Sequence, residues 1–259
     1  MDLGISGRTA IVCASSRGLG RGCAEALAEA GCHVVINGRD GDVLTKTAAE
    51  IAKSSGAKIT PVAADVATPD GQKALLDAAG HVDILVNNNA GPPLRDFRQL
   101  DRQAMIDGAI GNMVTPIEMI QAVADGMIER QFGRIVNITS LTVKMPVSGL
   151  DLSSAARAGL TAFLAGVSRQ IAGSNVTVNN LLPGKMDTDR LRANIKVGAE
   201  KAGISVDEMR TQQINAIPAK RFGNAAEFGQ ACAFLCSAHA GYITGQNLLV
   251  DGGLVPAAF

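Results

Sequence analysis

Residues 15–20, with the sequence SSRGLG, have the composition and placement of a phosphate-binding turn. They follow an apolar run at residues 9–13 that predicts a buried strand. From Leu19 onward, apolar side chains recur at helical spacing until Gly31. A glycine-containing turn between a strand and a helix exposes backbone N–H groups, and the helix dipole adds partial positive charge. The chemistry predicted for this segment is therefore the binding of an anion, phosphate in particular.

The end of the second predicted strand, residues 33–37, favours NADP over NAD. Where a strand, a glycine-containing turn and a helix bind NAD, the next strand usually ends with Asp or Glu, which accepts hydrogen bonds from the ribose 2′-hydroxyl. This chain instead has Arg39 after the strand and Arg17 in the phosphate turn. Arginine offers a planar fork of donors to a 2′-phosphate, so we expect NADP. The alternative is that Arg39 pairs at the surface with Asp40 or Asp42.

Strands and helices alternate along the chain around this turn. Strands are predicted at residues 9–13, 33–37, 59–64, 82–87, 134–138, 176–182 and 247–250. Helices are predicted over residues 42–55, 70–79, 152–171, 189–202 and 225–237. Two further helices are predicted to begin at residue 19 and near residue 101. A longer helix follows residue 112 and runs to residue 131, and Pro116 either breaks it or opens it. Repeated βα units predict an α/β fold. We expect a Rossmann-type doubly wound parallel sheet of about seven strands, with helices on both faces, as a single domain over residues 1–259.

Residues 185–219 form a polar and interrupted segment near the end of this pattern. Two interpretations stay open for it. It is either a mobile lid over a substrate or a solvated helical insertion with no role in binding.

Composition excludes several classes of protein. Lys+Arg and Asp+Glu are equal at 24 each, which gives no electrostatic reason to expect nucleic acid or an anionic membrane as partner. No apolar run approaches a membrane span, and the first residues do not have the pattern of a signal peptide. The five cysteines lie inside predicted strands and helices, so we expect reduced core thiols, no metal site and a cytoplasmic location.

The order of several motifs resembles the short-chain dehydrogenase/reductase family, in the branch of the 3-oxoacyl-(acyl-carrier-protein) reductases, over nearly the whole chain. The family's glycine motif, T-G-x-x-x-G-x-G, corresponds to residues 13–20, with Ala14 in place of the first glycine. The family's N-N-A-G motif corresponds to residues 87–91, where three consecutive asparagines allow two registers, and Asn88 is a motif asparagine in both. The P-G motif corresponds to residues 183–188.

The resemblance implies a set of coenzyme-binding residues. Phosphates are expected at the glycine motif, adenine at Asp65 and Val66, and the nicotinamide amide at the P-G motif. With Arg39 added from the charge argument, the expected set is Ala14, Ser16, Arg17, Gly18, Leu19, Gly20, Arg39, Asp65, Val66, Asn88, Ala90, Pro183, Gly184, Met186 and Thr188. The resemblance also implies a homo-oligomer, a tetramer or dimer, with the C-terminal strand region at the interface.

The catalytic positions depart from the family. Its members use Asn, Ser, Tyr and Lys, the last two as Y-x-x-x-K. Here Asn112 and Ser140 fit the first two positions, whereas Ser153 and Arg157 stand at the tyrosine and lysine positions. The only tyrosine, Tyr242, lies in the C-terminal segment and does not align with this role.

This departure changes proton transfer. In the family, the tyrosine gives a proton to the carbonyl oxygen, and the lysine lowers the tyrosine's pKa. A serine hydroxyl is a weaker acid, and arginine does not lose a proton near neutral pH. The i, i+4 spacing still places Ser153 and Arg157 on one helix face. The protonating group would then be water, the substrate or a neighbour such as Lys185 or Asp151, although a surface lysine and a helix N-cap explain those two residues more simply.

Three functions are consistent with these residues. The first is an NADP-dependent oxidoreductase that interconverts a small-molecule carbonyl and an alcohol with altered acid–base chemistry. The second is an NADP(H)-binding protein without efficient turnover that serves as a sensor or partner subunit. The third is a structural scaffold with a vestigial pocket.

Overall fold

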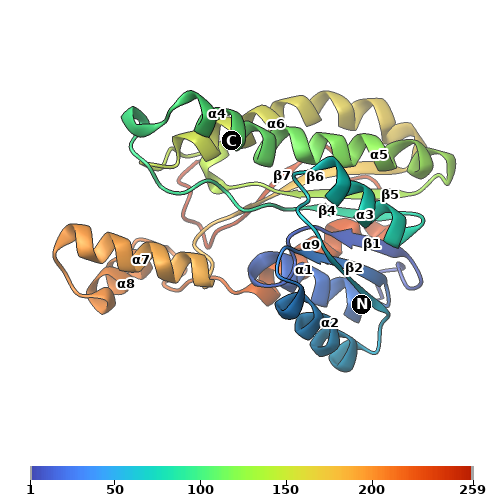
Figure 1. Cartoon of the computed structure of the whole chain (residues 1–259), viewed down its shortest axis with the longest axis horizontal. Coiled ribbons are helices and arrows are strands. Elements are labelled where there is room, and N and C mark those ends of the chain that lie inside the picture. The colour runs from blue at the N-terminus through green and yellow to red at the C-terminus, as the bar shows by residue number, and fades with distance from the viewer. Residues whose placement is uncertain (1, 258–259) are drawn as a thin grey trace.

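One parallel sheet of seven strands organises the chain (Figure 1). A computed structural model describes residues 2–257. The strands are β1 (Thr9–Val12), β2 (His33–Gly38), β3 (Ile59–Ala63), β4 (Ile84–Asn87), β5 (Gly133–Ile138), β6 (Val176–Pro183) and β7 (Asn247–Val250). Their order across the sheet is β3-β2-β1-β4-β5-β6-β7. Because β1 pairs with both β2 and β4, the winding direction reverses beside β1, where sheets of this kind leave a crevice for ligands.

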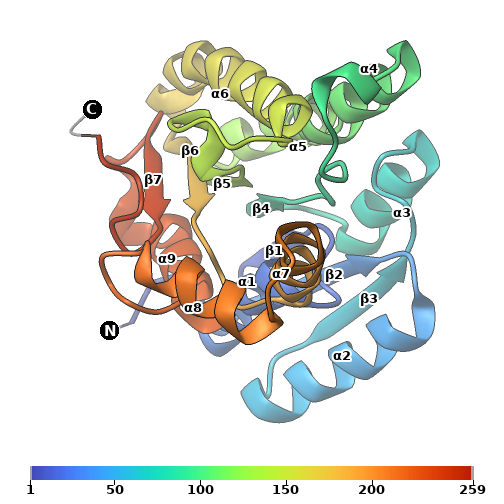
Figure 2. The ribbon, with the colours of Figure 1, turned by 90° about the vertical axis from the view of Figure 1, so that its left-hand side faces the viewer.

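Helices cover both faces of the sheet (Figures 1 and 2). They are α1 (Gly18–Glu29), α2 (Gly41–Ser55), α3 (Pro69–Ala79), α4 (Arg102–Ala109), α5 (Thr115–Glu129), α6 (Asp151–Ile171), α7 (Asp189–Ala202), α8 (Val206–Asn215) and α9 (Ala225–Cys236). Helices α1, α2 and α9 pack on one face, and α3, α5 and α6 pack on the other. The doubly wound α/β fold predicted from the sequence is thus confirmed.

Small residues let α1 and α9 cross closely under the sheet. A Cβ atom on Gly22 would lie 2.2 Å from the carbonyl oxygen of Ala225, and one on Gly229 would lie 2.1 Å from the carbonyl oxygen of Gly22. Neither position can accept a larger side chain without moving a helix. This crossing fixes α1, whose N-terminus follows the predicted phosphate turn.

The predicted strands and most predicted helices agree with the structure to within one or two residues. Of the two alternatives for Pro116, the structure shows the opening of a helix: Pro116 takes a first-turn position of α5, where its missing N–H is tolerated. The chain does not break there, because α4 runs into α5 through a wider π-helical turn, Ile110–Val114. One difference concerns a helix. Helix α8 was not predicted. Its sequence carries little apolar periodicity, and none of its residues is buried.

The segment at 185–219 is helical and stands apart from the sheet (Figure 1). Helices α7 and α8 project from the body as a pair. They are held by a separate small apolar cluster of Ile195, Ile217 and Phe222, with Leu191, Met209, Ile214 and Leu254 packed around it. The structure therefore shows a helical insertion with its own core. Whether the insertion acts as a lid stays a prediction.

All five cysteines are buried and unpaired, as expected for reduced core thiols. Burial raises the pKa of Cys13 and of Cys32 to about 12. Within residues 2–257, the side chains form no cluster of three or more metal-binding groups, and none of the helices has the length and hydropathy needed to cross a bilayer.

This burial predicts slow thiol labelling. At pH 8 the native protein should react with fewer than about one equivalent of dithionitrobenzoate over minutes, because the thiolate is the reactive species and burial disfavours it. In guanidinium chloride all five thiols should react at once. Rapid labelling of several thiols in the native state would contradict the burial described here.

Candidate active site

The predicted phosphate turn is fixed to the ends of β1 and β2. The Ser15 hydroxyl donates to the carbonyl of Val12 at 2.6 Å, and the Ser15 N–H donates to the carbonyl of Asn37 at 2.7 Å. The Asn37 side chain in turn accepts from the N–H of Ala14 at 3.2 Å. These contacts hold Ala14 at φ +45°, in the left-handed region that an alanine adopts only at a cost. Ala14 therefore adopts a backbone conformation that glycine reaches without strain.

The N-terminus of α1 is open to a ligand. Its N-cap residue is Arg17, whose side chain cannot cap the first N–H groups, and no side-chain cap is present. A Cβ on Gly20 would lie 2.4 Å from the carbonyl oxygen of Ala14, so the turn is packed against the helix as closely as backbone allows. Uncapped N–H groups at a helix N-terminus bind phosphate, and this turn fits the pyrophosphate of a dinucleotide.

Two cations near the turn lack acidic partners. Arg17 and Arg39 are exposed, and neither forms an ion pair with any residue within 2–257. The neighbouring Asp40 instead caps α2 by accepting from the N–H of Val43 at 3.1 Å. The alternative in which Arg39 pairs with an adjacent aspartate is therefore not what the structure shows, and both guanidinium groups remain available to a phosphate.

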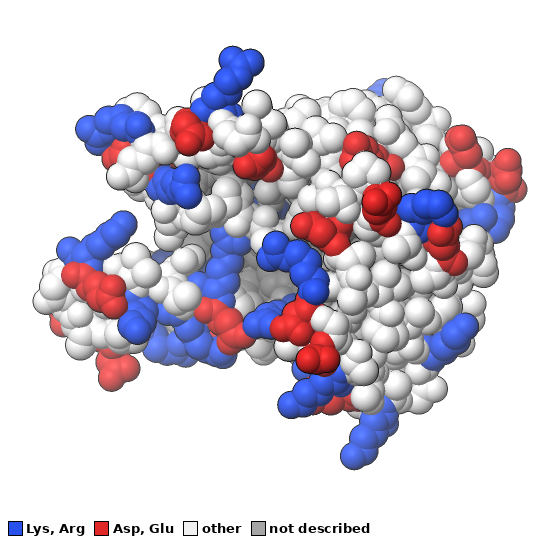
Figure 3. Space-filling view, in the orientation of Figure 1, with Lys and Arg blue, Asp and Glu red and all other residues white. Residues whose placement is uncertain are grey.

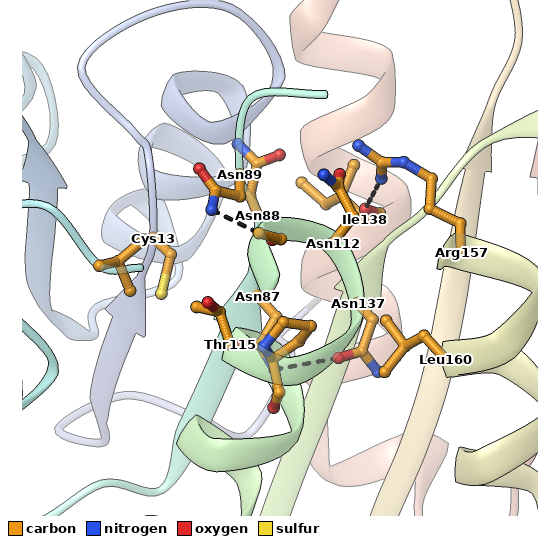
Figure 4. A pocket seen from close by; sticks show the side chains of 13 residues that line it. Cys13, Asn87, Asn88, Asn89, Asn112, Thr115, Asn137, Ile138, Arg157 and Leu160 are labelled. Atoms are coloured by element: carbon orange, nitrogen blue, oxygen red, sulfur yellow. Dashed lines mark hydrogen bonds between the residues drawn. The ribbon is translucent and has the colours of Figure 1, made fainter. Parts of the chain in front are cut away.

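A polar pocket opens where β4 and β5 end (Figure 4). Asn87 lies in β4 and donates to Asn137 of β5 at 3.0 Å, so it ties the two strands together. Asn88 donates to the carbonyl of Ala14 at 3.1 Å and so joins the end of β4 to the predicted phosphate turn. Asn89 extends beyond the strand and donates to the carbonyl of Gly111 at 3.1 Å. This geometry suits the ungapped register, in which Asn87 and Asn88 are the motif asparagines.

The structure brings Asn112 to the wall of this pocket. The π-helical turn between α4 and α5 carries it, and its side chain is 6% exposed. Its Oδ1 atom is buried without a hydrogen-bond donor, as is Oγ1 of Thr115 on the same wall. Buried acceptors without partners are costly, so both atoms suit a donor from a ligand or from solvent.

Arg157 reaches the same pocket from α6 (Figure 4). Its Nη1 donates to the carbonyls of Ile138 and Thr139 at 2.7 and 2.8 Å, and its Nε donates to Oγ of Ser153 at 3.2 Å. Burial, and secondarily the charge of Arg190, lowers the pKa of Arg157 to about 10, so the group remains a cation at neutral pH. The predicted pair Ser153 and Arg157 is thus assembled, but it offers no acid that ionises near pH 7.

The other predicted site residues lie around the pocket and differ in their burial. Ser140 lies at the end of β5, and its hydroxyl accepts from the N–H of Thr142. Thr188 caps α7, and its methyl group would lie 3.8 Å from a Cβ on Gly18, so the P-G segment passes beside the phosphate turn. The remaining members divide by burial: Val66 is buried and lines the pocket, Asp65 and Ala90 are exposed, and Ser16, Leu19, Pro183 and Gly184 are half-buried.

Two candidates do not point to the pocket, and neither does Tyr242, which does not align with a catalytic role. The Met186 side chain is 4% exposed and packs in the main core, so only its backbone can face a ligand. Asp151 is exposed in the first turn of α6, and Tyr242 is fully exposed.

Sequence reasoning missed Arg190, and it placed Asn89 in the asparagine motif in only one of the two registers. Nothing in the sequence indicates that Arg190 turns toward the loop after β4. Its Nη2 donates across the cleft to the carbonyl of Pro92 at 3.0 Å.

Comparisons with known proteins agree with this geometry. A family model described as enoyl-(acyl carrier protein) reductase matches residues 13–255. The chain is 33% identical over 257 residues to the 3-oxoacyl-(acyl-carrier-protein) reductase FabG of Vibrio cholerae, covering 97% of this chain and 99% of that protein. It is 32% identical over 254 residues to the NADPH-dependent reductase BacG of Bacillus subtilis, covering 96% and 98%. The structure of L-sorbose reductase from Gluconobacter frateurii, complexed with NADPH and L-sorbose, matches with a TM-score of 0.94 at 27% identity, covering 99% of this chain and 100% of that one.

The left-handed Ala14 predicts an unusual response to glycine. Ala14→Gly should stabilise the protein by about 0.5–1 kcal/mol, because relief of the left-handed strain exceeds the added entropy of the unfolded chain. The matched change Ala49→Gly, at an exposed position of α2, should instead destabilise it by about 1 kcal/mol. Guanidinium unfolding measures both. Equal destabilisation by the two changes would contradict the strain at Ala14.

Proposed function

Because this chain belongs to the short-chain dehydrogenase/reductase family, we propose that it is an NADPH-dependent oxidoreductase that interconverts a carbonyl and an alcohol with an altered proton-transfer group. The observation that carries the proposal is the juxtaposition at the ends of β1 and β4. There an uncapped helix N-terminus lies next to a pocket that holds a buried cation and an unpartnered amide oxygen. The first feature suits the coenzyme, and the second suits a polar substrate.

The coenzyme is NADP(H). Its pyrophosphate would lie on the turn at Ala14 and the start of α1, and its 2′-phosphate would lie between Arg17 and Arg39. When bound, NADPH supplies a hydride to the carbonyl carbon of the substrate. Asn88 donates to the carbonyl of Ala14 in the turn, and Thr188, at the start of α7, lies beside Gly18 of the turn, so both would border the bound coenzyme.

Protonation is the altered step. Addition of a hydride leaves the former C=O electron pair on oxygen as an alkoxide, which a nearby cation stabilises. Arg157 is that cation, held in place by two carbonyls, and Ser153 is the nearest hydroxyl to it. Neither releases a proton near pH 7, so the proton that completes the alcohol comes from solvent. General acids typically contribute about 10²–10⁴-fold, so we expect slow turnover with ordinary ketones.

The missing acid also favours a second candidate function. A protein with an intact coenzyme site and no group to protonate the product could bind NADPH as a sensor or as a partner subunit. Turnover with a panel of carbonyl and alcohol substrates, followed by the absorbance of the reduced nicotinamide, separates the two. Tight NADPH binding with no turnover would favour the sensor.

The resemblance to the family also bears on the oligomeric state of the chain and on the role of the α7–α8 pair. We infer a homo-oligomer through the C-terminal region, because β7 is an edge strand that leaves Leu248 40% exposed and Tyr242 lies fully exposed beside it in sequence. We infer that α7 and α8 cover the substrate as a lid on a single domain, because α7 starts beside the phosphate turn.

The coenzyme assignment predicts a selective loss of NADPH affinity. Arg39→Gln should weaken NADPH binding about 10–100-fold, the effect of one charge-assisted phosphate contact, and should leave NADH binding unchanged. Arg21→Gln is the control, since Arg21 already pairs with Glu25 and Glu50. Fluorescence titration of the reduced coenzymes measures both. Equal losses for NADPH and NADH would place the 2′-phosphate elsewhere, and no binding of either would end the proposal.

Restoring the family pair tests the altered protonation. The double change Ser153→Tyr with Arg157→Lys should raise turnover of a generic ketone by about 10²-fold or more. Ser153→Phe with Arg157→Lys adds the same bulk without a hydroxyl and should give no gain. If NADPH still binds and the tyrosine variant is no faster than the phenylalanine variant, proton donation is not what limits this site.

A further inference from the structure

The guanidinium of Arg157 is buried and keeps N–H donors that no acceptor among the described residues uses, although a buried charge without a partner is energetically costly. The side chain is 8% exposed, and within residues 2–257 no carboxylate lies within ion-pair distance of it. Its Nε and Nη1 atoms are bonded, whereas Nη2 has no hydrogen-bond partner among those residues. A buried cation without an anion is destabilising unless something else supplies the negative charge.

A second buried arginine shows what a purely structural one looks like in this fold. Arg134 is 1% exposed, and all three of its nitrogens donate: Nε to Ser237, Nη1 to Gly133 and Asn175, and Nη2 to Asn175. Its guanidinium also lies 4.5 Å from the ring centroid of Phe132. Arg134 is therefore satisfied by the protein alone. Arg157 is not, and its free end faces the pocket.

A second cation converges on that free end. Arg190 extends from α7 to the loop after β4. Its Nη1 lies 3.0 Å, and Arg157 Nη2 lies 3.4 Å, from the point that a Cβ on Gly91 would occupy. Arg190 also has no carboxylate within ion-pair distance among residues 2–257. In Figure 3, Lys and Arg side chains border the hollow between the α7–α8 pair and the body. Both guanidinium groups therefore lie against Gly91, close enough to each other for one anion beside that glycine to contact both.

We propose that Arg157 and Arg190 bind the carboxylate of the substrate, and that the substrate is a 2-oxo or 3-oxo acid, or the corresponding hydroxy acid. The proposal rests on the proposed function and deepens it. Both guanidinium ends lie against Gly91, and Arg157 also lines the pocket that holds the buried Asn112. A carboxylate held by the two arginines would therefore lie within a few atoms of a carbonyl bound in that pocket. That spacing suits a short oxo acid.

The phosphates of the coenzyme are the other source of negative charge. They have their own binding groups at the start of α1 and at Arg17 and Arg39, on the β1–β2 side of the crevice. Arg157 instead comes from α6 and donates to the carbonyls at the end of β5. The position of the pair therefore favours the substrate.

The test is binding of matched probes to the NADP⁺-loaded protein, where a ketone cannot be reduced. Acetoacetate should bind at least about 10-fold more tightly than its neutral isostere acetoacetamide, and pyruvate more tightly than pyruvamide, by calorimetry. In Arg190→Gln this preference should fall about 10-fold or more, and in Arg190→Lys most of it should remain. NADPH affinity should change less than about twofold in either variant.

The matched control is Arg192→Gln, on the same helix. Arg192 pairs with Asp187 at 3.1 Å and Asp189 at 2.9 Å, so it is already neutralised. This change should leave the preference for acetoacetate intact, and circular dichroism checks that all variants fold.

Two results would overturn the proposal. One is equal affinity of the wild-type protein for the acid and the amide. The other is a loss of NADPH affinity in Arg190→Gln that matches any loss of acetoacetate, which would assign the pair to the coenzyme's phosphates. If the wild-type protein binds no NADPH, the proposed function fails separately, and the acid–amide comparison on the protein without coenzyme then decides the anion site.

Discussion

The contact between Asn88 and the carbonyl of Ala14 is the interaction on which the rest of the site depends. It joins the end of β4 to the turn after β1, where the chain winds away in opposite directions on either side. The α1 N-terminus and the pocket can be neighbours only because these two strand ends are adjacent. The same junction explains the close packing at Gly20, since a Cβ there would meet both Ala14 and the Asn88 amide.

The strain at Ala14 and the buried charge of Arg157 both lower the stability of the folded protein, and both are features that favour the binding of a ligand. Left-handed backbone at an alanine and a desolvated guanidinium both reduce the free energy of unfolding. Each is held by several hydrogen bonds to strand ends, so the scaffold over-determines both. Costs of this kind concentrate where a protein binds or reacts. Both lie at the edge of the sheet where its ligands are expected.

The predicted replacement of the family's tyrosine and lysine by Ser153 and Arg157 would change the chemistry of the pocket and not its architecture. The π-helical turn presents Asn112, and α6 presents Ser153 and Arg157 along one face. A hydride acceptor can therefore be oriented, and negative charge on its oxygen can be stabilised. What the pocket lacks is a group whose proton leaves near pH 7. In the function that we propose, the chemistry accordingly moves from proton transfer toward electrostatic stabilisation by a fixed cation.

The sequence was sufficient for the elements with strong periodicity. The buried β-branched runs of β1 and β4, and the strand-turn-helix pattern around Gly18, identified the α/β fold and the phosphate turn, because burial on both faces leaves few alternatives. It was insufficient for α8, whose helix buries no residue of its own, and for the π-helical turn, because a wider turn has no distinct hydrophobic period. It also left the register of the asparagine run open, since three identical residues carry no positional information.

The residue types by themselves predicted that a phosphate binds after β1 and that the usual acid of the family is missing, and they showed that Arg39 directly follows β2. These are properties of short stretches of chain, so residue types and their spacing in the sequence are enough to predict them. Only the tertiary structure decided that, among residues 2–257, Arg39 has no acidic partner and Arg157 is a buried cation with an unused donor. The same holds for the approach of Arg190 to Arg157 across 33 positions of sequence. The reason is that burial and the absence of a partner depend on every segment that packs around a side chain, and no single segment encodes them.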